Sequence, residues 1–252
     1  MKSLLLAAGF ATRMYPPTKN FPKPLLEIGG KTIIDRLLAD IDTIEGIDEH
    51  LIVTNDIFYT YFKAWQLRTH YKHPITIIND GTICNECRKG AVCDILYVVE
   101  KLSLKEDLLV LAGDQVIDFS LKELVAFAKA KGTTCVTCQR ETSVELLQKL
   151  VVLVVDESFK VVALFDKPEV PPTQWAVTPF CFFKGSDLEL IYKAVAGGCG
   201  FDEPVHLVGW LTNHGHVHAW PLPGKRHRIN DAASYEVVNQ IYNDNKKSGQ
   251  LL

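Results

Sequence analysis

The sequence lacks the motifs that assign many nucleotide-binding and hydrolytic proteins at once. It contains no GxxxxGK[ST] segment and no GxGxxG segment, which excludes a P-loop and a dinucleotide-binding fingerprint. A Gly-x-Ser-x-Gly elbow is also absent, so a hydrolase with a serine triad has no support. No hydrophobic run is long enough to span a bilayer, and the apolar run after Lys2 is too short for a secretion signal.

A strong excess of one charge is missing too. The formal net charge is −3, which argues against a nucleic acid or an anionic membrane as a partner. The seven cysteines are an odd set without a secretion signal, so we expect reduced thiols and a cytoplasmic protein. The pairs Cys84/Cys87 and Cys135/Cys138 have zinc-like spacing. Residues three apart on a predicted strand over 133–139 point to opposite faces, so no zinc site is predicted there.

The N-terminal segment combines a buried strand with a loop suited to phosphates. Leu4 to Ala8 is an apolar run, which predicts a central parallel strand. Gly9 allows the backbone to turn sharply and to approach a ligand. Thr12 adds a hydroxyl, and Arg13 and Lys23 bring cationic donors to the same end of the strand. The segment therefore predicts a binding site for a polyphosphate.

Strands and helices then alternate along the chain. Residues 31–44 place apolar side chains at helical spacing, and strands are predicted at 51–54, 75–78 and 108–112. This alternation predicts an α/β fold with a doubly wound, mostly parallel sheet, whose ligands bind at the carboxyl ends of the strands. After Gly132 the pattern changes to strand pairs, which predicts a β-rich insertion.

Asp114 is the predicted metal ligand. It follows the apolar strand 108–112 and Gly113, which leaves room for the backbone beside the carboxylate. Magnesium prefers hard oxygen ligands, often one or two carboxylates with phosphates and waters. The alternative is that Asp114 caps the helix that begins near Ser120.

These motifs resemble the sugar-1-phosphate nucleotidyltransferases, which make nucleotide sugars. Their usual pattern is Leu-Ala-x-Gly-x-Gly-Thr-Arg followed by Pro-Lys-x-Leu. This chain has Leu6-Ala-Ala-Gly-Phe-Ala-Thr-Arg13 and then Pro22-Lys-Pro-Leu25, with Ala11 in place of the second glycine. The resemblance implies a Rossmann-like nucleotidyltransferase fold. It also implies Mg²⁺-dependent transfer of a nucleoside monophosphate from an NTP to a sugar 1-phosphate, with release of pyrophosphate.

The resemblance also implies that different parts of the chain bind the nucleotide and the acceptor. We expect one nucleotidyltransferase domain over 1–252, with a nucleotide-binding half at 1–132 and an acceptor-binding half at 133–252. Arg13 would stabilise pyrophosphate, and Lys23 would lie between the α-phosphate and the acceptor phosphate. The implied nucleotide-binding residues are Leu6, Ala8, Gly9, Arg13, Asn85 and Gly90.

Two further implied groups serve the acceptor and the metal. Asp166-Lys167-Pro168 resembles the family's Glu-Lys-Pro, so Lys167 would bind the acceptor phosphate and Asp166 a sugar hydroxyl. Arg228 stands where an aspartate is usual for the second metal ligand. Asn230 or Asp231 would then join Asp114 at the metal.

Two alternatives remain open at this stage. Leu150-Val-Val152 replaces a glycine that contacts the hexose in relatives, which suits a cytidylyltransferase acting on phosphocholine or another small phosphate. Trp175, Trp210 or Trp220 would then face the quaternary ammonium. Arg228 instead favours a nucleotide-binding regulatory protein without catalysis. In each case the partners are small phosphates, with no nucleic acid and no membrane, and a homo-oligomer is left open.

Overall fold

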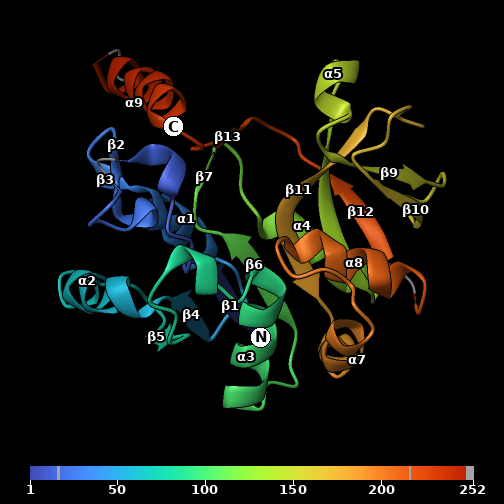
Figure 1. Cartoon of the computed structure of the whole chain (residues 1–252), viewed down its shortest axis with the longest axis horizontal. Coiled ribbons are helices and arrows are strands. Elements are labelled where there is room, and N and C mark those ends of the chain that lie inside the picture. The colour runs from blue at the N-terminus through green and yellow to red at the C-terminus, as the bar shows by residue number, and fades with distance from the viewer. Residues whose placement is uncertain (16–17, 216, 248–252) are drawn as a thin grey trace. The chain divides into compact units, whose positions relative to one another are not determined.

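The computed structural model describes residues 1–15, 18–215 and 217–247, which fall into two compact units (Figure 1). The Asp114 unit consists of Ser3–Arg88, Ala112–Lys122 and Gly224–Leu252. The Lys167 unit consists of Met1–Lys2, Lys89–Leu111 and Glu123–Pro223. The expected division at residue 132 concerns what each half binds, and it stays a prediction.

The Asp114 unit contains a parallel pair of strands and three of the described α-helices. Its strands lie in the order β1 (Lys2–Leu6), β4 (Glu49–Thr54) and β5 (Ile75–Asn79), and β4 and β5 are parallel. Its helices are α1 (Ile33–Ile41), α2 (Asp56–Gln66) and α9 (Ala232–Lys247). The apolar positions of α1 are fully buried, which confirms the helical spacing predicted from the sequence.

The same unit also contains short helices and strands near the carboxyl ends of its parallel strands. They are the 3₁₀ helices η1 (Thr12–Met14), η2 (Lys23–Leu25) and η3 (Asn85–Cys87), and the strand pairs β2 (Glu27–Ile28) with β3 (Lys31–Thr32) and β7 (Gln115–Ile117) with β13 (Arg226–Arg228).

One apolar cluster joins segments of the Asp114 unit that are far apart in the sequence. It contains Met14 from η1, Ile33 from α1, Val116 from β7 and Val238 from α9. The Asn239 side chain adds a hydrogen bond, because its Oδ1 accepts from a β2–β3 turn amide at 2.9 Å. Helix α9 is therefore packed against η1 and β7.

The Lys167 unit is dominated by antiparallel strands. Strand β11 (Trp175–Phe183) pairs antiparallel with β6 (Leu108–Ala112), β8 (Thr134–Arg140) and β9 (Val151–Val155). Strand β9 forms a hairpin with β10 (Val161–Asp166), and β12 (Val217–Pro221) pairs parallel with β8. The helices are α3 (Ala91–Leu102), α4 (Lys122–Lys131), α5 (Val144–Leu147), α6 (Gly185–Leu188), α7 (Ile191–Ala196) and α8 (Pro204–Thr212). These strands confirm the predicted β-rich insertion.

The first strand ends earlier than predicted. β1 ends at Leu6 rather than Ala8. The Ala8 carbonyl accepts from the side-chain amide of Asn55 at 3.0 Å instead of from a neighbouring strand. Asn55 also caps α2, since its Oδ1 accepts from the Phe58 N–H at 2.9 Å. A single buried amide thus fixes both the start of α2 and the backbone that leads into Gly9.

The cysteines require one correction. Cys84 and Cys87 form a disulfide, whereas reduced thiols were expected throughout. Cys84 precedes the tight turn of η3 and Cys87 ends it, which brings their Cα atoms to 5.4 Å, within disulfide range. Cys135 and Cys138 are buried in β8, and burial raises the pKa of their thiols to about 11 and about 12.

Among the described residues, no helix is both long and apolar enough to cross a membrane.

We expect Asn55→Ala to destabilise the Asp114 unit strongly. The change removes a helix cap and leaves the Ala8 carbonyl without its side-chain donor, for a combined loss of about 2–4 kcal/mol. Urea unfolding followed by circular dichroism measures it. Thr43→Ala is the control, because it removes an exposed hydroxyl bonded to a carbonyl and should change stability by less than about 0.5 kcal/mol. Equal losses in the two variants would contradict the role given to Asn55.

Candidate active site around Asp114

Asp114 lies where β6 leaves the sheet, next to the end of β1. The Gly113 N–H donates to the Leu6 carbonyl at 3.0 Å. A Cβ at Gly113 would come within 2.9 Å of that carbonyl oxygen and 3.2 Å of the Pro24 ring. Gly113 therefore allows the backbone of β1 and the Pro22–Leu26 segment to approach the carboxylate closely.

The Asp114 carboxylate is contacted by three side chains. The Lys23 ammonium lies 3.1 Å from Oδ2, and the Arg228 guanidinium lies 3.7 Å from the same atom. The Gln115 amide donates to Oδ1. The Ile229 backbone completes the cluster, because its N–H donates to the Asp114 carbonyl at 3.0 Å and its carbonyl accepts from Lys23 at 2.6 Å.

These contacts decide between the two roles considered for Asp114. α4 begins without it, because the Lys122 N–H is bonded to the Ser120 hydroxyl and the Leu121 N–H to Asp40. The carboxylate is directed instead at cationic side chains from distant parts of the Asp114 unit. Asp114 is therefore part of a polar site and not a helix cap.

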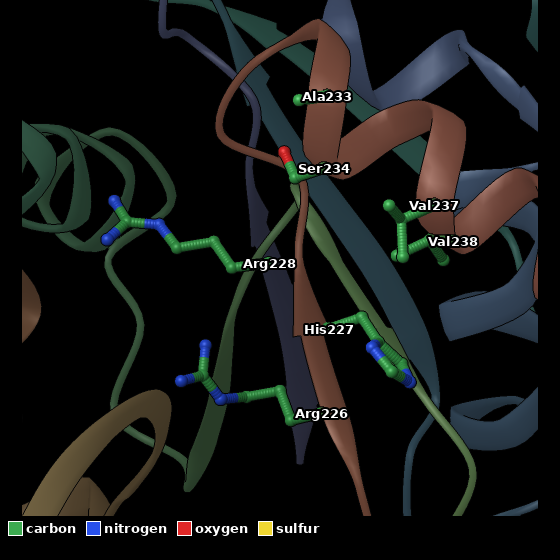
Figure 2. Close-up of a pocket in the computed structure, with 7 residues that line it drawn as sticks. All are labelled: Arg226, His227, Arg228, Ala233, Ser234, Val237 and Val238. Atoms are coloured by element: carbon green, nitrogen blue, oxygen red, sulfur yellow. The ribbon is translucent and has the colours of Figure 1, made fainter. Parts of the chain in front are cut away.

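Alternate residues of β13 bring two arginines to one face. Figure 2 shows Arg226 and Arg228 extending to the same side of the strand and His227 to the other. The Arg226 guanidinium donates to the Gln115 amide oxygen at 2.6 Å. Burial lowers the pKa of Arg226 to about 10, helped by the charge of Arg228, so Arg226 remains protonated at neutral pH.

The residues after β13 separate the two candidates for a second metal ligand. The Asp231 carboxylate accepts from the Ser234 N–H at 2.8 Å, which caps α9. That hydrogen bond is the largest cause of the lowered pKa of Asp231, and the charges of Arg13 and Lys23 add to it. The Oδ1 atom of Asn230 is buried and finds no hydrogen-bond donor among residues 1–15, 18–215 and 217–247. A buried amide oxygen of this kind fits a cation ligand, whereas Asp231 already has a structural partner.

In the loop after β1, Gly9 is open to solvent and Ala11 has a strained backbone conformation. A Cβ at Gly9 would meet nothing within 4 Å, so the exposed backbone there is accessible to a ligand. Ala11 has a φ of 49°, in the left-handed region that favours glycine. This geometry explains the glycine that relatives usually carry at the position. The Thr18 hydroxyl donates to the Ala11 carbonyl at 2.8 Å and supports the turn.

The other predicted nucleotide-binding residues have identifiable structural contacts. The Leu6 and Ala8 carbonyls accept hydrogen bonds from the residues that surround the site. Asn85, on η3, accepts from Arg88 at 3.3 Å. In the Lys167 unit, Gly90 precedes α3 with a φ of 87°, and a Cβ there would collide with the Phe201 carbonyl. Nucleotide binding by these residues stays a prediction.

The predicted acceptor residues lie in the Lys167 unit. Asp166 ends β10, and Lys167 follows it with a φ of 49° and a largely exposed side chain. The two side chains are 3.9 Å apart, and His206 on α8 lies 4.0 Å from the other Asp166 oxygen. His206 was not predicted from the sequence, where no pattern links it to Asp166.

The tryptophans proposed for a quaternary ammonium are engaged in packing. Trp210 stacks on His214 with ring centroids 3.6 Å apart, and Trp175 packs edge-on against Phe159 at 5.6 Å. Trp220 is buried in β12. These contacts favour the packing role for all three and weaken the phosphocholine alternative.

Sequence reasoning missed two members of the cluster, Gln115 and Arg226. An alternating Arg-x-Arg pair on a strand is a weak signal, because it gives no information about the partner strand. The pairing of β13 with β7, in which Arg228 is opposite Gln115, brings both residues to the carboxylate.

Comparison with known proteins assigns the family. A family model described as nucleotidyl transferase matches residues 2–198. The chain belongs to the nucleotidyl transferase family. It is similar to a solved structure of UDP-glucose pyrophosphorylase complexed with UDP-glucose, with a TM-score of 0.81 and 20% sequence identity over 96% of this chain and 98% of that chain. The family and the fold class predicted from the sequence are confirmed.

Two relatives define the level of sequence similarity. UTP–glucose-1-phosphate uridylyltransferase of Synechocystis is 27% identical over 68% of this chain and 45% of the relative. Glucose-1-phosphate thymidylyltransferase of Neisseria meningitidis is 24% identical over 96% of this chain and 85% of the relative. The chain thus spans about half the length of the Synechocystis enzyme and of several other curated relatives.

We expect Gly113→Ala and Gly9→Ala to differ in stability. The first places a methyl group within 2.9 Å of a backbone oxygen, which should cost about 1–3 kcal/mol of unfolding free energy. The second places it in open space and should change stability by less than about 0.5 kcal/mol. Thermal and urea unfolding of both variants provide the measurement. A destabilised Gly9→Ala with an unaffected Gly113→Ala would show that the loop geometry is misassigned.

Proposed function

We propose that this protein transfers a nucleoside monophosphate from an NTP to a sugar 1-phosphate and releases pyrophosphate. The observation that carries the proposal is the contact of Lys23 with Asp114 beside an open phosphate loop. Membership in the nucleotidyl transferase family supports it, as do relatives that act on glucose 1-phosphate. The site chemistry and the family therefore lead to the same reaction.

Charge balance around Asp114 suits a polyphosphate substrate. Arg13, Lys23, Arg226 and Arg228 all act on the Asp114 and Asp231 carboxylates or on each other, which gives an excess of cationic groups. Such an excess attracts an anion and stabilises charge on the departing pyrophosphate. We assign this stabilisation to Arg13, which is exposed on η1.

Lys23 is the group best placed to orient the reacting phosphates. Two of its three N–H donors are used by the Ile229 carbonyl and the Asp114 carboxylate, which fixes the ammonium. We propose that the third donor binds the α-phosphate oxygen and lowers the repulsion of an incoming phosphate. Holding two anions in line accounts for much of the rate in phosphoryl transfer.

The residues present fit a magnesium ion. The Asp114 carboxylate and the buried Asn230 amide oxygen are hard oxygen donors, and we propose that these two residues hold the ion. When bound, Mg²⁺ neutralises phosphate charge. Asp231 contributes by capping α9, which holds the backbone of the neighbouring Asn230 through the Ser234 hydroxyl.

Arg228 takes a different role from the aspartate usual at its position. In the absence of ligands it pairs with Asp114 and offsets its negative charge. We propose that Arg228 turns to a substrate phosphate when the metal binds, because a guanidinium beside Mg²⁺ would be repelled. With this change of partner from Asp114 to a phosphate, Arg228 is compatible with an active enzyme.

The acceptor side of the proposal rests on the Lys167 unit. Lys167 is exposed, cationic and held at the end of β10, so it suits a phosphate monoester. Asp166 and His206 lie beside it and can accept or donate hydrogen bonds to sugar hydroxyls. A polar group of this kind favours a sugar 1-phosphate over phosphocholine. We place the reaction in the cytoplasm, which the five free thiols support.

We expect Asp114→Asn to reduce turnover by at least ~10²-fold, because it removes a principal charge from the site while preserving its shape. Pyrophosphate release is measured with each of four NTPs against a panel of sugar phosphates and phosphocholine. Asp244→Asn on α9 is the matched control and should retain full activity. The proposal would be refuted if none of the acceptors in the panel led to pyrophosphate release, or if Asp114→Asn kept near-normal turnover.

We expect Arg228→Met to strengthen Mg²⁺ binding in the absence of nucleotide. Removal of a half-exposed competitor for the Asp114 carboxylate should raise affinity about two- to five-fold, which corresponds to an ion pair of about 0.4–1 kcal/mol. Calorimetric Mg²⁺ titration measures the change. Turnover should fall, because a substrate contact is lost. A wild type that binds no Mg²⁺ and a variant that gains both binding and turnover would instead identify a degenerate regulatory protein.

A further inference from the structure

A second polar cluster occupies the opposite edge of the parallel strands in the Asp114 unit. Asp42 ends α1, His50 is the second residue of β4, and His73 precedes β5. These positions are at the amino ends of β4 and β5, whereas Asn55 and Asn79 mark their carboxyl ends. The cluster is therefore separate from the phosphate loop.

Three potential ligand atoms converge in this cluster. One oxygen of Asp42 lies 3.0 Å from His50 Nε2 and 2.9 Å from His73 Nδ1. All three atoms lie within 4.8 Å of one another. With metal–ligand bonds of about 2.0–2.2 Å, ligand atoms of a tetrahedral zinc site lie about 3.3 Å apart. The oxygen–nitrogen pairs need to separate by only a few tenths of an ångström to admit an ion.

Buried groups around the cluster are arranged as supports for metal ligands. The Ser3 hydroxyl lies 2.7 Å from His50 Nδ1, and both side chains are fully buried. In a metal site, the imidazole proton of His50 would lie on Nδ1 and be donated to the Ser3 hydroxyl, so that Nε2 would present its lone pair to the ion in place of its hydrogen bond to Asp42. The second Asp42 oxygen accepts from the Lys72 N–H at 2.7 Å, which orients the carboxylate. Metal-binding histidines and carboxylates are usually held by hydrogen bonds of this kind.

We propose that Asp42, His50 and His73 form a zinc-binding site. Two imidazoles and one carboxylate are the donors that zinc prefers, whereas Mg²⁺ favours oxygen ligands alone. The side chains of Asp42 and His73 are 13% and 14% exposed, so the site has access to solvent for a water as the fourth ligand. The site would fasten α1 to the segment before β5, at the edge of the sheet away from the proposed chemistry.

Zinc titration of the untagged chain of residues 1–252 tests the proposal. After treatment with EDTA, the wild type should take up one Zn²⁺ per chain from a chromophoric chelator, and zinc should raise its melting temperature. Ser3→Ala should weaken binding by about 10-fold through loss of the hydrogen bond to His50. His73→Gln, at a partly exposed ligand, should weaken it further and abolish the rise in melting temperature.

Two controls make the result specific. His70→Gln changes an exposed histidine in the same segment and should bind zinc like the wild type. Cys84→Ser removes the Cys84–Cys87 pair, which would compete for zinc if its disulfide were reduced, and should also leave binding unchanged. Failure of the wild type to bind zinc at one equivalent, or equal binding by His73→Gln, would overturn the proposal and leave the cluster as a hydrogen-bonded contact. Neither outcome depends on nucleotidyl transfer.

Discussion

The carboxylate of Asp114 is the group on which the candidate active site depends. It is shared by Lys23 and Arg228, and the Ile229 backbone bonds both the Asp114 carbonyl and the Lys23 ammonium. These contacts join two distant segments of the chain, one with Lys23 and one with Arg228 and Ile229, to the end of β6. Gly113 makes the arrangement sterically feasible, because a side chain there would push the end of β1 away. The Lys23 segment and β13 are therefore organised around one charge.

The surplus of cationic groups around this carboxylate causes repulsion between them, and in the proposed reaction it attracts a polyphosphate. Burial lowers the pKa of Arg226, and repulsion from the charge of Arg228 lowers it further. A triphosphate would relieve that repulsion, because it brings several negative charges to the same place. The buried amide oxygen of Asn230, which accepts no hydrogen bond among the described residues, is the complementary feature, because in the proposed function it is a donor for a cation. In the proposed reaction, a metal ion and a polyphosphate would together offset both features.

The parallel strands of the Asp114 unit separate two kinds of polar site. At their carboxyl ends, open backbone at Gly9 and exposed cations suit exchange of substrates. At their amino ends, the buried Ser3 and His50 and the more accessible Asp42 and His73 form a closed network of hydrogen bonds. This division follows from the fold, because loops at the carboxyl ends can vary around a bound ligand while the opposite edge holds the strands and helices together.

The sequence by itself determined the local features of this protein: the alternation of strands and helices, the phosphate loop, and Asp114 at the end of an apolar strand. These are encoded in periodicity and in short motifs. Only the tertiary structure decided which residues surround Asp114, because Lys23 is 91 positions away and the Arg226–Gln115 contact spans 111. The three-residue strands β7 and β13 are too short to show an alternating pattern, yet their register places both arginines. The zinc-site proposal likewise depends on contacts between α1, β4 and the segment before β5, which no local spacing in the sequence encodes.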